Sequence, residues 1–151
     1  MKEEMIKDII QITAAIIGSA GFGIVFNIHA GKLWAATLGG LVSWVSYLLL
    51  AHLGLNEYLC GFFAAALTTA YAEIMARVTR SPAIMYVVVG TVPLIPGAGL
   101  YRSMFALLRQ DMITARHQGT YALLFAASMA AGIVLTTLVE RTAFSIKSLQ
   151  S

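Results

Sequence analysis

The sequence has little charge for its length. Asp, Glu, Lys and Arg together make up 11% of the 151 residues, whereas hydrophobic residues make up 59%. Water-soluble domains carry roughly a quarter charged residues, because their surface has to be covered by polar groups. The scarcity of charge therefore excludes a soluble globular enzyme as the class of this protein.

Cysteine is nearly absent. Cys60 is the only cysteine, so no internal disulfide can form, and it lies within an apolar stretch. The three histidines, His29, His52 and His117, stand alone and form no His-Glu-x-x-His pattern. No serine or threonine has a designated neighbouring base. We expect no metal, no cofactor and no enzymatic activity.

A basic run is also missing. The ten Lys and Arg residues exceed Asp and Glu by three, but they are spread over separate short polar segments. Nucleic-acid-binding proteins concentrate their basic residues in one patch or stripe, so nucleic acid is not an expected partner. In a five-span arrangement the basic residues divide evenly between the two sides, and the positive-inside rule selects no orientation.

The sequence is rich in long apolar stretches. There are five, each 18 to 21 residues long, and Glu73 is the only charged residue inside them. An α-helix needs about 20 mostly apolar residues to cross the hydrocarbon of a lipid bilayer. We predict an all-α membrane protein, a single integral membrane domain over residues 1–151 built as a bundle of five transmembrane helices. The expected helices cover about residues 9–26, 33–53, 58–76, 83–101 and 120–139.

The segments between the stretches are short, which favours antiparallel neighbouring helices. The longest, residues 102–119, alternates apolar and polar residues and is predicted to extend the fourth helix along the membrane interface. Gly, Ala and Ser recur four residues apart in the first, second and fifth stretches. This spacing is typical of closely packed membrane helices.

The fourth stretch is interrupted by the segment Pro-Leu-Ile-Pro-Gly. Pro93 and Pro96 cannot donate a backbone N–H, so carbonyls near Val89 and Val92 lose their helical partners. Broken helices near mid-membrane bind substrates or ions in many secondary transporters. We expect a break over Thr91–Gly97 whose free carbonyls, with the Thr91 hydroxyl, face a polar cavity. A plain proline kink and a re-entrant turn are the alternatives. The candidate substrate-contacting residues here are Thr91, Pro93, Pro96 and Gly97.

A second candidate feature is a polar stripe on the third stretch. Thr69, Glu73, Arg77 and Arg80 follow one another at helical spacing and lead to a membrane edge. Lipid provides neither a counter-charge nor a hydrogen-bond partner for a charged side chain. Glu73 and Arg77 are therefore expected to pair and to point into the bundle or toward a partner. The alternative is an ion pair that only fixes the end of the helix. Further candidates for lining a path are Ser43, Tyr47 and Asn27.

Four segments resemble the threonine/serine exporter family. They are Gly21-Phe-Gly-Ile-Val-Phe-Asn27, Leu41-Val-Ser-Trp44-Val-Ser-Tyr47, Ala72-Glu73-Ile-Met-Ala-Arg77-Val-Thr-Arg-Ser-Pro82 and Pro93-Leu-Ile-Pro96-Gly97-Ala-Gly-Leu-Tyr101-Arg102. More narrowly, the chain is similar to the short subunit of the split form, which corresponds to the C-terminal membrane half of the fused exporters. The residues that match the family pattern are Glu73, Arg77, Pro82, Pro93, Pro96, Gly97 and Tyr101.

The resemblance implies a multi-pass protein of the bacterial inner membrane that works with a larger membrane subunit. Together the two would export a small polar or anionic metabolite, either a small amino acid such as threonine or serine, or a dicarboxylate such as succinate. A scaffold protein that stabilises a transporting partner without lining the path is the alternative function. Association of the chain with a second copy of itself is left open.

Overall fold

The computed structural model describes the backbone of residues 2–149 and the side chains of residues 3–142, so the outermost residues of the predicted 1–151 domain lie outside it. Within these residues the protein is entirely helical. The elements are α1 (Lys2–Val25), α2 (Ala30–His52), α3 (Glu57–Thr79), α4 (Ala83–Thr91), the short 3-10 helix η1 (Val92–Leu94), α5 (Gly97–Leu108) and α6 (Met112–Leu149).

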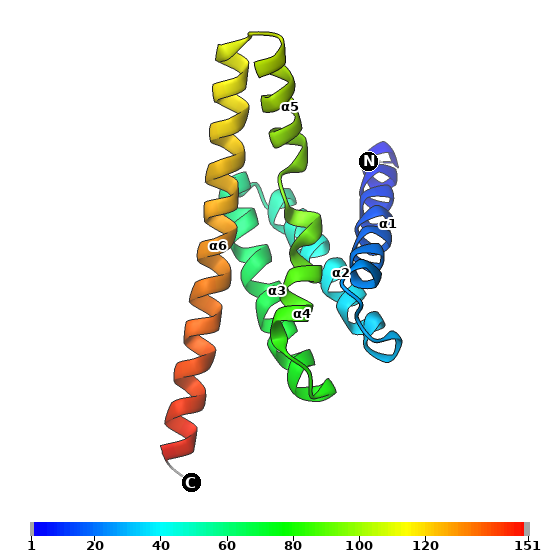
Figure 1. Ribbon diagram of the computed structural model, residues 1–151, viewed down its shortest axis with the longest axis vertical. Helices are drawn as coiled ribbons and strands as arrows, with labels where there is room; N and C mark the ends of the chain where they lie inside the picture. Colours follow the sequence, from blue (N-terminus) through cyan, green and yellow to red (C-terminus); the bar gives the residue numbers. More distant parts are fainter. Residues whose placement is uncertain (1, 150–151) are drawn as a thin grey trace.

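Helix α3 occupies the middle of the bundle and packs against α2, α4 and α6, whereas α1 lies on the outside and packs mainly against α2. Helices α5 and α6 form a hairpin that extends past the ends of α2 and α3 (Figure 1). The chain runs up and down through the bundle. It follows the antiparallel order that the short connecting segments favour.

Four of the described helices, α1, α2, α3 and α6, contain segments long and apolar enough to cross a membrane. The pair formed by Ala83–Leu94 and Gly97–Leu108 meets the same requirement only as a unit, and its two parts are bent by 57°. The all-helical class predicted from the sequence is confirmed for the described residues. The number of crossings is four, or five if the bent pair passes through the bilayer as one span.

The helix ends follow ordinary capping chemistry. Helix α1 stops where Asn27 adopts a left-handed conformation with φ of 55°, and α2 stops before Gly54, with φ of 80°. Both residue types tolerate this conformation at the end of a helix. Helix α3 begins after Asn56, whose side chain accepts a hydrogen bond from the Tyr58 backbone N–H at 3.2 Å. Local sequence thus fixes the joints between the spans.

The predicted interfacial extension over residues 102–119 is wrong in its second half. Helix α5 ends at Leu108, and Asp111 accepts a hydrogen bond from the Thr114 backbone N–H at 3.1 Å, so α6 begins at Met112. Hydrogen bonds from Thr114 also hold the pKa of Asp111 below its ordinary value. Asp is a strong N-cap residue, and here it turns one expected helix into the tip of a hairpin.

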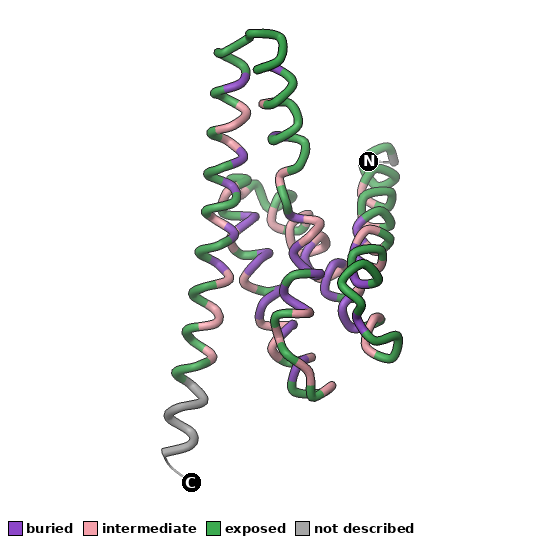
Figure 2. The backbone as a smooth tube through the Cα atoms, in the orientation of Figure 1, coloured by how far each residue is buried: buried purple, intermediate pink, exposed green. Residues whose placement is uncertain are grey.

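Small residues bring the helix backbones close together, as expected in a membrane. A side chain at Gly90 of α4 would collide with Thr68 of α3 and press on the backbone of Gly39 in α2. A side chain at Gly132 of α6 would overlap the Phe62 carbonyl of α3. Figure 2 shows the buried residues gathered where α2, α3, α4 and the middle of α6 meet.

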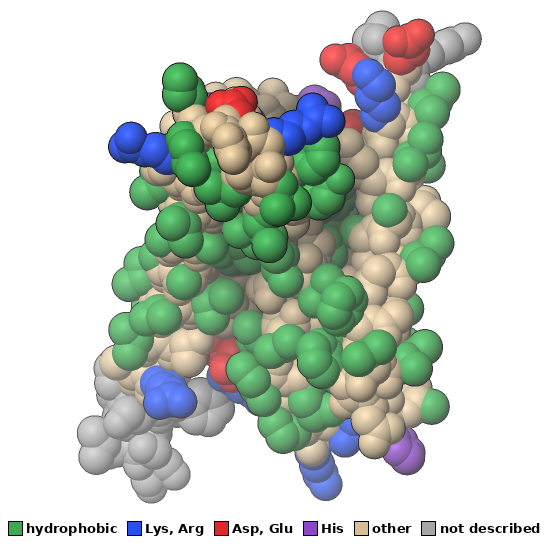
Figure 3. Space-filling model, turned by 45° about the horizontal axis from the view of Figure 1, so that its top comes forward, with side chains coloured by type: hydrophobic (Ala, Val, Ile, Leu, Met, Phe, Trp, Pro, Cys, Tyr) green, Lys and Arg blue, Asp and Glu red, His purple; other side chains and the backbone are tan. Residues whose placement is uncertain are grey.

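The surface shows the distribution expected of a membrane bundle. In Figure 3 the charged side chains lie toward the ends of the visible face, and hydrophobic side chains cover most of the area between them. Many large hydrophobic side chains are exposed, including Ile17, which is 66% exposed, and Val25, which is 77% exposed. In a bilayer such side chains contact lipid or a neighbouring protein rather than water.

Candidate functional site

The bend between α4 and α5 contains the two prolines. Helix α4 ends at Thr91, η1 covers Val92–Leu94, and α5 begins at Gly97 directly after Pro96. Pro93 has no N–H to offer the Val89 carbonyl, which ends the α-helical pattern. The Val92 carbonyl, which Pro96 cannot serve, instead accepts a hydrogen bond from the Ile95 N–H at 3.1 Å.

Thr91 is the last residue of α4. It is buried, and its hydroxyl donates to the Val87 carbonyl at 2.8 Å within the same helix. Threonine in a helix commonly satisfies its hydroxyl in this way. In the structure Thr91 does not line the cavity found at the bend, and contact between its hydroxyl and a substrate stays a prediction.

A cavity of about 200 Å³ lies at the bend. Pro93, Pro96 and Gly97 line it from the α4–α5 connection, together with Tyr47 of α2. Aromatic rings of α2 and α6 form much of the opposite wall: Trp44, Tyr47, Tyr121 and Phe125. The structure thus brings together four residues that the sequence singled out. The cavity is smaller than the roughly 300–1,000 Å³ typical of sites for drug-sized ligands.

Trp44, next to the candidate Ser43 on α2, also lines this cavity. Its ring stacks on Tyr47 at a centroid distance of 5.4 Å. Its indole N–H is buried and has no hydrogen-bond partner among the described residues. Trp44 and Pro93 also border a second hollow of about 260 Å³, lined on the α1 side by Gln11. An unpaired buried donor is costly in apolar surroundings.

Two other predicted residues lie elsewhere. Ser43 is buried, and its hydroxyl donates to the Gly40 carbonyl at 2.9 Å. Asn27 occupies the left-handed position that ends α1. Both have local structural roles, and neither lines the cavity at the bend.

Glu73 and Arg77 lie at the other end of α3, where Arg77 joins two helices. The Arg77 guanidinium is 2.6 Å from the Glu140 carboxylate on α6 and 3.9 Å from the Glu73 carboxylate. With Arg141, these side chains line a hollow of about 300 Å³. Glu140 was missed because its partner lies 63 positions away, and no local pattern connects them.

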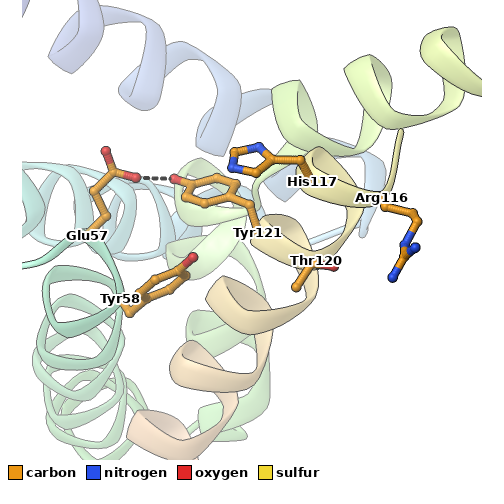
Figure 4. A pocket seen from close by; sticks show the side chains of 6 residues that line it. All are labelled: Glu57, Tyr58, Arg116, His117, Thr120 and Tyr121. Atoms are coloured by element: carbon orange, nitrogen blue, oxygen red, sulfur yellow. Dashed lines mark hydrogen bonds between the residues drawn. The ribbon is translucent and has the colours of Figure 1, made fainter. Parts of the chain in front are cut away.

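A further hollow of about 500 Å³ lies at the end of the bundle where α3 and α6 meet (Figure 4). The Tyr121 hydroxyl donates to the Glu57 carboxylate at 2.6 Å. The sequence treated these residues as parts of connecting segments or as membrane-interface aromatics, and it gave no signal that they converge. The lining residues are Glu57, Tyr58, Arg116, His117, Thr120 and Tyr121.

No group of three or more His, Cys, Asp or Glu side chains among the described residues could hold a metal ion. The polar groups at the two ends and at the bend are hydrogen-bonding residues, ion pairs and aromatic rings. Within the described part of the chain they include no arrangement of nucleophile and base.

Comparison with known proteins supports the same class. The family model described as Threonine/Serine exporter, ThrE matches residues 11–139. No curated protein and no solved structure shows a significant match to the chain. The matched region covers most of the sequence and includes the bend, its cavity and the Glu73–Arg77 pair. This multi-pass membrane protein, with its transport rather than enzymatic role, belongs to the threonine/serine exporter family.

Proposed function

We propose that the chain is a subunit of an exporter of small polar amino acids, and that the bend between α4 and α5 binds the substrate. The observation that carries this proposal is the cavity at the bend, where Pro93, Pro96 and Gly97 lie with Trp44 and Tyr47 around one space. A cavity of this size with aromatic walls suits a small molecule. The family supplies the substrate class.

In this proposal the bent pair crosses the membrane as one broken span. Helix α4 starts beside the end of α3, and α5 ends beside the start of α6, so the pair runs from one end of the bundle toward the other (Figure 1). A re-entrant segment would return to the end at which it started. The break then lies within the membrane, where only protein or a polar ligand can satisfy free backbone groups.

The proposal includes a larger membrane subunit in the inner membrane of a bacterium. Helix α1 supports this part, because it packs mainly on α2 and leaves large apolar side chains exposed along much of its length. In this proposal a helix of the partner subunit, rather than lipid, covers these side chains. A scaffold role, in which the chain only stabilises that partner, is the competing function.

The double substitution Pro93→Ala and Pro96→Ala tests the proposal. Restoring two backbone donors favours a continuous helix, which closes the break while leaving the lipid-facing surface unchanged. We expect export of threonine and serine to fall to the background level, with membrane insertion and complex formation retained. Export is measured as loss of the amino acid from loaded cells of the native host, in which the variant replaces the chromosomal copy.

Pro82→Ala is the matched control, because Pro82 precedes α4 and lies outside the break. It should export at the wild-type rate. Normal export by the double variant would remove the break as the substrate site. Loss of export that always accompanies loss of the complex would favour the scaffold role. Efflux of succinate rather than threonine or serine from wild-type cells would show that the substrates are dicarboxylates and not small amino acids.

A further inference from the structure

The hollow lined by Glu57, His117 and Tyr121, of about 500 Å³, has no part in the function proposed above. It contains one carboxylate, one guanidinium and one imidazole. Figure 4 shows side chains from two helices, α3 and α6, converging on it. Groups of opposite charge in one hollow match a ligand that carries both charges.

The centre of this hollow is the hydrogen bond from the Tyr121 hydroxyl to Glu57, at 2.6 Å. Tyr58 flanks it, with its ring 5.8 Å from the Tyr121 ring. The His117 imidazole lies beside the Tyr121 ring, and the Arg116 side chain extends away from Glu57 (Figure 4). Both basic side chains are exposed.

Tyr121 separates this hollow from the cavity at the bend. Its side chain lines both spaces, and it is the only described residue that does so. The bond to Glu57 therefore fixes the position of a ring that borders both this hollow and the cavity beside Pro96 and Gly97. A ligand that displaces Tyr121 from Glu57 would release that ring.

We propose that this hollow is an outer binding site for an α-amino acid, in which the substrate's ammonium group replaces the Tyr121 hydroxyl on Glu57. The carboxylate of the amino acid is bound by His117, with Arg116 adding positive charge at the rim. The inference rests on the proposed export function. It adds a second binding site on the same path and the residue that separates the two.

The charge of the site selects its ligand class. An ammonium group makes a stronger hydrogen bond to a carboxylate than a phenol does, so it can displace Tyr121 from Glu57. A dicarboxylate would place a second negative charge beside Glu57 and be repelled. The site is therefore expected to prefer threonine or serine over succinate.

Two substitutions distinguish a ligand-binding role of Glu57 from a role in which its hydrogen bond to Tyr121 only joins α3 to α6. Glu57→Gln removes the charge but can still accept the Tyr121 hydrogen bond, so the fold is retained. Tyr121→Phe removes the competing hydroxyl and keeps the ring that lines both spaces. Asp111→Asn is the matched control, because it also replaces a carboxylate by an amide, at the hairpin tip, and an amide oxygen keeps the cap on Thr114.

Transport of radiolabelled threonine is measured in membrane vesicles of both orientations from the native host, so that any partner subunit is present. Glu57→Gln should raise KM by about twofold to fivefold, the factor expected for one exposed charge pair. Tyr121→Phe should lower KM about threefold, because no hydroxyl has to be displaced. Asp111→Asn should leave KM unchanged. Shifts of KM in the same direction for the first two variants, or no shift in either, would overturn the proposal.

Failure of this inference can be distinguished from failure of the export function. Wild-type vesicles that move neither threonine nor serine contradict the export function itself. Wild-type vesicles that transport threonine with a KM indifferent to Glu57→Gln contradict only the outer site. The Pro93→Ala, Pro96→Ala variant adds an independent measurement: it should still bind radiolabelled threonine without transport, and that binding should weaken when Glu57→Gln is added.

Discussion

The two halves of the bent pair are held very differently. Helix α4 is inserted between α2 and α3, and five of its nine residues are buried, among them Tyr86 and Val89, which are 0% exposed. Helix α5 packs chiefly against α6, and only Gly99 and Ala106 of its twelve residues are buried. One half belongs to the core of the bundle, and the other belongs to the α5–α6 hairpin.

The difference locates the boundary between two packing units at Pro93–Gly97. Above it, α5 is fixed to α6 by the hydrogen bond from Ser103 to the Ala115 carbonyl at 2.8 Å. Below it, α4 is fixed to α2 by the close approach of Gly90 and Gly39. The cavity lies where these units meet, so any relative movement between them changes its shape. A site at such a boundary can open and close without disrupting either unit.

The largest expected effect comes from Gly90→Ala in the core half. The added Cβ would lie 2.7 Å from the Thr68 methyl carbon and 3.3 Å from the Gly39 backbone. Over-packing of this kind costs about 1–3 kcal/mol, and the better helix propensity of Ala offsets up to about 1 kcal/mol. We expect the free energy of unfolding to fall by about 1–2 kcal/mol, measured by denaturation in detergent. An unchanged value would show that α4 is not wedged between α2 and α3.

A smaller effect is expected from Ser103→Ala in the hairpin half. Hydrogen bonds between membrane helices contribute about 0.6 kcal/mol on average, so global stability should change little. The change should instead be local, because this bond joins α5 to α6 and does not involve α4. Hydrogen exchange should become faster in the backbone amides of α5 and stay the same in α4. Equal acceleration in both helices would mean that the two halves form one unit.

The smallest effect is expected from Gly97→Ala at the boundary itself. No atom lies within 4 Å of the added Cβ, and the backbone of Gly97 does not require glycine. Replacing Gly by Ala at such a position stabilises a protein by about 0.4–1 kcal/mol, because it lowers the conformational entropy of the unfolded chain. The midpoint of thermal unfolding should rise slightly. A fall of several degrees would show that something outside this chain approaches Gly97 closely.

Much of the fold follows from apolar length and capping residues. Helices α2 and α3 lie within a few residues of the stretches 33–53 and 58–76, because polar joints with Asn27, Gly54 and Asn56 mark their ends. The ends of the first and last helices were predicted less well. Helix α1 starts at Lys2 rather than near residue 9, since its first turns continue the helix with polar residues such as Glu3 and Glu4.

The candidate site was predictable only in part. Proline chemistry pointed to Pro93, Pro96 and Gly97, because a missing backbone donor is visible in one residue. Glu140 was not singled out, because its role depends on which helices are neighbours. The hydroxyls of Thr91 and Ser43 are bonded to carbonyls about one turn back in their own helices, a partner that the sequence analysis did not assign to them. Sequence identifies broken backbone more readily than the side chains that gather around it.

The length of α6 has a mechanical consequence. Tyr121 and Glu140 lie nineteen residues apart on this helix, about 28 Å at 1.5 Å per residue, which is close to the roughly 30 Å thickness of the hydrocarbon. None of the three prolines falls within α6, and the helix is continuous between these residues. The segment of α6 between these two residues is therefore expected to move as one rigid helix. An axial displacement of α6 that moves Tyr121 against Glu57 at one face moves Glu140 against Arg77 at the other by the same distance.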